Sequence, residues 1–146
     1  MHEALSRANF ERDVKLLYPA FVANRKWLVN AVEFPILDVT FLDGLPLRLR
    51  LKCDQWDELP PSVSLLNPDG SDWTTTLPNP TFHQDAHPTT GRPFICMIGS
   101  REYHEHSSHV GDLWANHKPA DGMNLLGLLD RFHSAWRQAT KTWRPA

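Results

Sequence analysis

The stretch ILDVTFLDGLPLRLRLK, residues 36–52, contains two segments of alternating apolar and polar residues and is the clearest indication of a fold in this chain. Every second residue from Leu37 to Phe41 is apolar, and leucine alternates with Arg or Lys from Leu47 to Lys52. A period of two is typical of strands with one buried and one solvent-facing side. We therefore expect two strands here, with Asp38 and Thr40 facing solvent.

The flanking sequence extends this pair to an antiparallel meander. Asp43-Gly44, between the two segments, is a turn signal. The residues from Trp27 onward are already rich in β-formers, and a short apolar run, Ser62 to Leu66, follows Pro60-Pro61. That run ends at the turn sequence Asn67-Pro-Asp-Gly70. Three or four strands are therefore expected between residues 27 and 66.

The segment from Glu3 to about Tyr18 is predicted to be an amphipathic helix. Leu5, Phe10, Val14 and Leu17 approximate the helical period, and Pro19 follows as a stop signal.

A second helix is expected from Asp121 to Ala139. Asp121 is a suitable N-cap residue. One apolar stripe runs along the helix and is expected to be buried: Leu125, Leu128, Leu129, Phe132, Trp136 and Ala139.

The order helix, meander, irregular segment, helix indicates an α+β domain. Residues 1–146 fit one domain. Between Ser71 and about Pro93 no period survives, and irregular stretches of this length are often functional. Six of the eight histidines lie between His83 and His117, so the candidate functional side chains are concentrated in this irregular part of the chain and just after it.

Composition excludes several classes of function. The formal net charge of −2 and the lack of a basic stripe give no electrostatic footprint for nucleic acid. The apolar stretches are short of a membrane span, so no membrane partner is expected. Cys53 and Cys96 form no CxxC pair and no disulfide framework, which favours a reducing cytoplasm.

Together with the first helix and the strand pair that ends at Lys52, an ordered set of short motifs resembles the ubiquitin-conjugating enzyme superfamily, and the resemblance runs from the first helix through Trp136. The set is Leu59-Pro60-Pro61, His87-Pro88-Thr89, Gly91, Ile95-Cys96-Met97, Trp114, Pro119 and the helix from Asp121. The resemblance implies the ubiquitin-conjugating fold: an N-terminal helix, an antiparallel β-meander, an irregular active-site loop and a C-terminal helix.

Two departures point to divergent bacterial members of the superfamily. Thr89 stands where the family has an asparagine that supports the oxyanion, and the gap from Cys96 to Trp114 is lengthened by SREYHEHSSH, residues 100–109. Such bacterial members are encoded beside ubiquitin-like proteins and activating enzymes and are linked to antiphage defence. The pattern of Cys96, Glu102 or Glu105, His106 and His109 also resembles a predicted metal-binding family from the same operons.

The resemblance implies that Cys96 accepts a ubiquitin-like protein as a thioester from an activating enzyme and passes it to an amine of a protein target. Thiolate suits this role because it is both nucleophile and leaving group. Cys96, His87, His106 and His109 are the expected catalytic-site residues, His87 by fixing the loop. No cofactor is required in this hypothesis.

A metal-binding accessory domain is the alternative from another class. Cys96, Glu105, His106 and His109 would then be ligands, with zinc as the metal that such a donor set suits. A third hypothesis is an inactive ubiquitin-binding variant of the fold. In all three, Cys53 is expected to be a buried structural residue.

Overall fold

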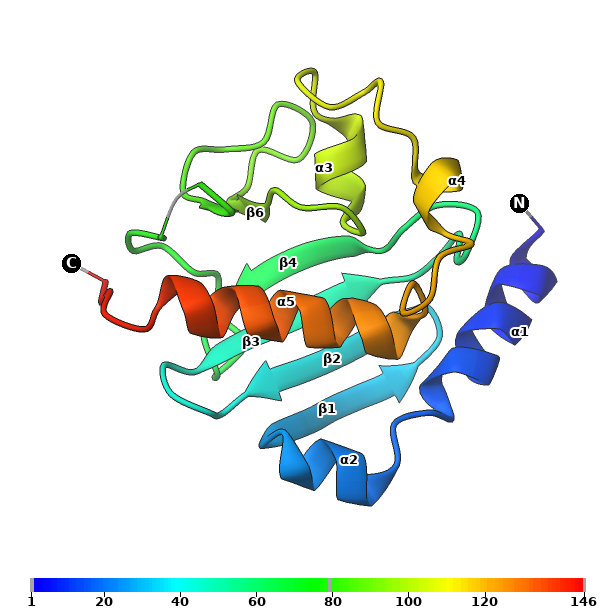
Figure 1. Ribbon diagram of the computed structural model, residues 1–146, viewed down its shortest axis with the longest axis horizontal. Helices are drawn as coiled ribbons and strands as arrows, with labels where there is room; N and C mark the ends of the chain where they lie inside the picture. The colour runs from blue at the N-terminus through cyan, green and yellow to red at the C-terminus, as the bar shows by residue number, and fades with distance from the viewer. Residues whose placement is uncertain (1, 79, 146) are drawn as a thin grey trace.

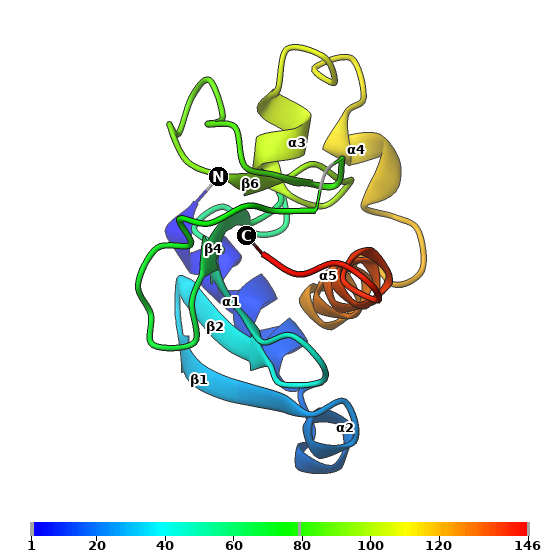
Figure 2. The same cartoon turned by 90° about the vertical axis from the view of Figure 1, so that its left-hand side faces the viewer.

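The computed structural model describes residues 2–78 and 80–145 and has an α+β architecture. Its centre is an antiparallel sheet in the order β1-β2-β3-β4. The strands are Trp27–Glu33, Ile36–Phe41, Leu47–Lys52 and Ser62–Leu66. Helix α5, Leu125–Ala139, crosses one face of the sheet (Figure 1), and its end-on view in Figure 2 shows it on one side only. The predicted α+β class and the antiparallel meander are confirmed.

The core lies between this sheet face and α5. Leu37 pairs with Leu51 and Val39 with Leu49, so the alternating apolar residues of β2 and β3 meet on one face. On α5, Phe132 is fully buried, together with most of the predicted stripe. Apolar burial of this kind is the main source of folding free energy. The predicted packing of the closing helix is therefore confirmed.

The expectation that the other sheet face is wet at Asp38 and Thr40 is wrong. Both side chains are buried, because Arg48 lies over Asp38 with Nε 2.8 Å from Oδ1 and Arg50 Nε lies 3.0 Å from Oδ2. Burial alone would raise the pKa of Asp38, but hydrogen bonds from Arg48, Asn30 and Arg50 outweigh it and lower that pKa. The alternation of apolar and polar residues showed which residues share a face of the sheet. It could not show that long arginine side chains cover the polar face.

The N-terminal helix is shorter than expected. Helix α1 spans Glu3–Val14, and Pro19 begins a second helix, α2, Pro19–Asn24. Proline fits the first turn of a helix, where its missing N–H is not needed. Phe10 is buried as predicted, whereas Leu5 is 53% exposed.

The closing helix begins later than predicted. Asn124, not Asp121, is the N-cap, and its Oδ1 accepts from Gly127 N at 2.7 Å. A carboxylate from α1 also accepts at the start of α5: buried Asp13 accepts from Leu125 N at 3.1 Å and from Trp56 Nε1 at 2.9 Å. Asp13 thus links the first and last helices to the segment after β3.

Beyond the β4 edge lies a small layer that carries the histidine-rich segment (Figures 1 and 2). Strands β5, Phe82–His83, and β6, Phe94–Ile95, form an antiparallel pair. Helices α3, Arg101–Glu105, and α4, Trp114–His117, follow β6. Part of the expected loop at 100–109 is therefore helical. Within residues 2–78 and 80–145, no helix has both the length and the apolar character to cross a bilayer.

Candidate active site

Cys96 follows directly after β6, and its N–H donates to Thr81 O at 2.6 Å, which ties it beside the β5 segment. Its side chain is half-buried, whereas Cys53 is fully buried. Burial raises the pKa of both thiols above the ordinary value. Cys96 is thus the thiol that solvent reaches, and it stays protonated at neutral pH unless a base takes its proton.

His109 is the imidazole next to this thiol. Its Nε2 lies 3.5 Å from Cys96 Sγ. The imidazole stacks on Tyr103, with ring centroids 4.2 Å apart and an interplanar angle of 17°. Stacking fixes the plane of the imidazole and leaves its Nε2 edge toward the sulfur.

Tyr103 is itself held by Asp112. The phenol O–H donates to Asp112 Oδ2 at 2.6 Å, and the other carboxylate oxygen lies 2.5 Å from His117 Nε2. The hydrogen bond to Asp112 raises the pKa of Tyr103 to about 12, so the phenol remains a donor. The hydrogen bonds from Tyr103 and His117 lower the pKa of Asp112. A chain of four side chains therefore runs from Cys96 outward: His109, Tyr103, Asp112 and His117.

His104 ties the two loops of the site together. Its Nε2 accepts from Gly99 N at 3.2 Å, and its Nδ1 lies 2.7 Å from Asp112 O, to which it donates. Burial lowers the pKa of His104, in keeping with a neutral ring that has one donor and one acceptor nitrogen. Gly99 has φ +103° and lies so close to α5 that an added Cβ would fall 2.4 Å from Leu128 Cδ2.

His87 holds the irregular loop against α3. The ring is buried, its Nε2 donates to Glu102 O at 2.8 Å, and its Nδ1 accepts from Thr89 N at 3.1 Å. Both nitrogens are therefore engaged with the backbone. The geometry fits the loop-fixing role expected for His87.

Of the other three expected metal ligands, His109 contacts Cys96, whereas Glu105 and His106 make no hydrogen bond to it among the described residues. His106 stacks on Phe94 and accepts from Ser108 N at its Nδ1, and Glu105 is exposed. In the described part of the chain, no three or more His, Cys, Asp or Glu side chains are grouped so that they could hold a metal ion. Metal binding by this donor set stays a prediction, which metal analysis of the purified protein tests.

The carboxylate of Glu102, the other acidic residue in that predicted pattern, faces away from the thiol. It accepts from Ser62 Oγ at 2.5 Å and from Val63 N at 2.8 Å, both on β4.

Tyr103 and Asp112 are the site residues that the sequence did not reveal. Tyr103 was visible only as one member of the inserted segment 100–109, and Asp112 lies outside it. The one available signal is the density of polar and aromatic residues around the histidines. No motif or period relates a stacking tyrosine to its carboxylate partner.

Comparison with known proteins gives a partial match over this half of the chain. Residues 80–138 match the Y4jH-like family model, described as the Y4jH family. A 40-residue segment is 42% identical to a Sinorhizobium fredii (strain NBRC 101917 / NGR234) protein described as uncharacterized protein y4jH. That segment covers 27% of this chain and 20% of that protein. The family match includes Cys96, His104, His109 and Asp112, so similarity falls on the thiol site and α5.

Proposed function

We propose that this chain is a ubiquitin-conjugating-like carrier that holds a ubiquitin-like protein as a thioester on Cys96 and transfers it to an amine of a protein target. The observation that carries the proposal is the half-buried Cys96 thiol with His109 Nε2 at 3.5 Å. The arrangement of meander, α5 and a cysteine after a short strand supports it. In this proposal the chain works in the bacterial cytoplasm.

Loading is an exchange of thioesters. Cys96 Sγ attacks the carbonyl carbon of the acyl group on the activating enzyme, and His109 takes the thiol proton. The new S–C bond forms as the old one breaks, and the departing thiolate recovers a proton. Imidazole suits this role because it exchanges protons near neutral pH.

Discharge reverses the roles at the sulfur. The target amine attacks the same carbonyl carbon, an amide bond forms, and Cys96 leaves as a thiolate. His109 accepts one proton of the attacking nitrogen and passes it to the Cys96 thiolate. His87 acts through the backbone by holding the loop before Cys96, and Tyr103 acts by orienting His109.

The test is charging with ATP, an activating enzyme and a ubiquitin-like protein from a bacterial operon of the kind that the resemblance implies, followed by electrophoresis with and without reductant. We expect an adduct that thiol reductants cleave. Cys96→Ser should give an oxyester that resists reductants or no adduct, because an alkoxide is a poorer leaving group.

The matched control is Cys53→Ser, which should charge normally because Cys53 is fully buried. A reductant-sensitive adduct that survives Cys96→Ala and disappears in Cys53→Ala would refute the assignment. Metal analysis of the purified protein tests the alternative function. Stoichiometric zinc that is lost in Cys96→Ala would favour the accessory metal-binding domain.

A further inference from the structure

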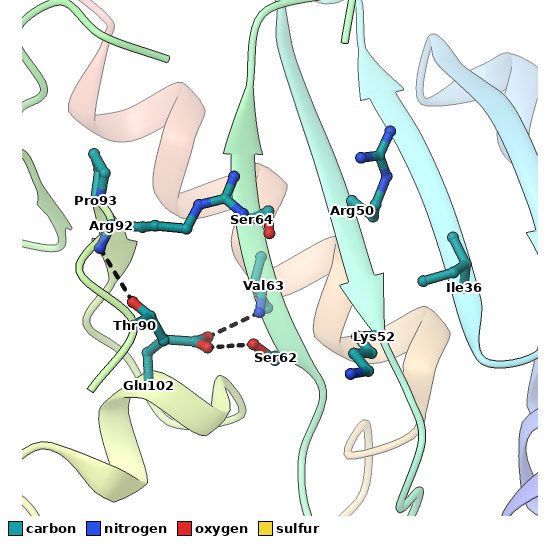
Figure 3. A pocket seen from close by; sticks show the side chains of 10 residues that line it. All are labelled: Ile36, Arg50, Lys52, Ser62, Val63, Ser64, Thr90, Arg92, Pro93 and Glu102. Carbon is teal, nitrogen blue, oxygen red and sulfur yellow. Dashed lines mark hydrogen bonds between the residues drawn. The ribbon is translucent and has the colours of Figure 1, made fainter. Parts of the chain in front are cut away.

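A cavity of about 260 Å³ lies on the sheet face opposite α5, beside the segment that leads to Cys96. In the register of the sheet, Arg50 is opposite Ser64, and Lys52 is opposite Ser62. Arg92 closes the cavity from the irregular loop, as Figure 3 shows. Three cationic side chains from two separate parts of the sequence therefore surround one cavity.

These cations are only partly neutralised. Lys52 has no ion pair within residues 2–78 and 80–145. Arg50 contacts Asp38 through Nε, and its terminal nitrogens have no hydrogen-bond acceptor among the described residues. Arg92 pairs through one terminal nitrogen with Asp72, a side chain that is itself 70% exposed. Such exposed pairs are weak, so Arg92 can turn toward a ligand at little cost.

The hydroxyl groups of the cavity add neutral donors. Thr90 Oγ1 accepts from Arg92 N at 3.2 Å, which leaves its O–H proton free to donate. The hydroxyl of Ser64 has no hydrogen-bond partner in the described part of the chain. Donors thus reach the cavity from β3, from β4 and from the loop, and they approach from different directions.

The one carboxylate in the lining, Glu102, is already occupied. Ser62 Oγ and Val63 N each donate to one of its oxygens (Figure 3), and the side chain is only 3% exposed. A cation entering the cavity would meet three positive side chains and no free carboxylate. An anion would meet cations and unused donors, which favours oxyanion recognition.

We propose that this cavity binds the phosphate group of a small phosphomonoester. Phosphate offers oxygens in several directions, which matches donors that come from three elements, whereas carboxylate is planar. Ile36 and Pro93 supply an apolar wall for the organic part of the ligand. The proposal does not use the thiol, so it goes beyond the proposed carrier function and stands or falls separately from it.

The test is an NMR titration of the Cys96→Ala protein with inorganic phosphate and with phenyl phosphate at constant ionic strength. We expect saturable shifts of the backbone amides of Ser64, Thr90 and Arg92. The double variant Lys52→Gln/Arg92→Gln should bind at least about tenfold more weakly, because charged hydrogen bonds are lost. An unchanged amide spectrum without ligand shows that it remains folded.

The control is Arg137→Gln/Lys141→Gln, which removes the same charge from α5 and its C-terminal neighbour and should bind as the parent does. Equal loss of affinity in this control would mean non-specific attraction and would refute the site. Non-saturable shifts would refute it too. Saturable binding of benzoate with no binding of phosphate would replace the phosphate assignment by a carboxylate site.

Discussion

The environment of Cys96 makes its reactivity depend on one neighbour. Because burial raises the pKa of the thiol, alkylation by iodoacetamide should still increase with pH above the ordinary thiol value. At pH 7, His109→Ala should slow alkylation of Cys96 several-fold, since Nε2 no longer accepts the proton. At pH 10 the difference should shrink. Mass spectrometry of the modified peptides measures both rates.

The matched control for that experiment is His106→Ala, because this imidazole stacks on Phe94 rather than contacting the sulfur. An equal loss of rate in His106→Ala would contradict the assignment of His109. Cys53 should remain unmodified in the folded protein at either pH, since its side chain is fully buried.

Gly99 is expected to be the most sensitive glycine of the thiol loop. Its φ of +103° and a Leu128 Cδ2 atom 2.4 Å from an added Cβ combine backbone strain with a clash. Gly99→Ala should lower the free energy of unfolding by about 2–5 kcal/mol, the sum of a left-handed penalty and overpacking. Urea unfolding at pH 7.5 measures it.

Two other glycines separate these contributions. Gly91 has φ +69° but no atom within 4 Å of an added Cβ, so Gly91→Ala should cost only about 1–2 kcal/mol. Gly111 has neither feature, and Gly111→Ala should be nearly neutral. Equal costs at Gly91 and Gly99 would show that the approach of α5 is not limiting.

At the scale of elements, Asp13 connects α1, the Trp56 segment and the start of α5. Asp13→Ala would leave Trp56 Nε1 and Leu125 N buried without acceptors, at about 1–3 kcal/mol each. We therefore expect a loss of about 2–6 kcal/mol in the free energy of unfolding, measured by urea denaturation.

Asp130→Ala is the matched control, because Asp130 also links α5 to a neighbour but is 44% exposed in its pair with Arg25. Exposed pairs contribute about 1 kcal/mol or less. Comparable losses in the two variants would contradict the role assigned to the buried carboxylate.

The elements that could be predicted from the sequence are those whose apolar period is complete. The β2–β3 alternation and the α5 stripe placed the sheet and its covering helix, because a repeated period fixes which residues face inward. Helix boundaries were harder to predict. Asp121 and Asn124 are both good caps, and what favours Asn124 over Asp121 is the tertiary contact of Asp13 with Leu125 N, next to the local bond from Gly127 N to Asn124. That Cys96 and His109 share a site was expected from the family resemblance, but the sequence did not distinguish His109 from His106 as the neighbour of the sulfur.

The rest of the site depends on contacts that leave no pattern in the sequence. Asp112 stabilises Tyr103 through a single hydrogen bond, and His104 joins Gly99 to the Asp112 backbone. Such contacts need only one donor and one acceptor, and many polar residues of the segment could supply them.

For the whole molecule, pH should affect stability through two imidazoles, the buried His133 and the half-buried His104. Burial lowers the pKa of His104 and of His133 in the folded state. Below about pH 6.5, the ordinary value for histidine, the unfolded chain binds protons that the folded chain does not. Stability should therefore fall as pH decreases from 7.5 to 5.

Urea unfolding across that range checks the sign, and His133→Gln should make the decline shallower because glutamine does not titrate. A stability that is flat or rises toward pH 5 would contradict the assignment. Asp38 acts at lower pH: its folded-state pKa is lowered, so its contribution is lost as pH falls below the ordinary aspartate value.

The position of α5 in the chain has a consequence for synthesis on the ribosome. The apolar side of the sheet is complete once β4, ending at Leu66, has emerged, but its cover begins only at Leu125. At about 5–20 residues per second, the nascent chain spends several seconds with the β2 and β3 leucines uncovered. During this time a chaperone could bind the exposed apolar face of the sheet. A pause in translation between Leu66 and Leu125 would prolong that exposure.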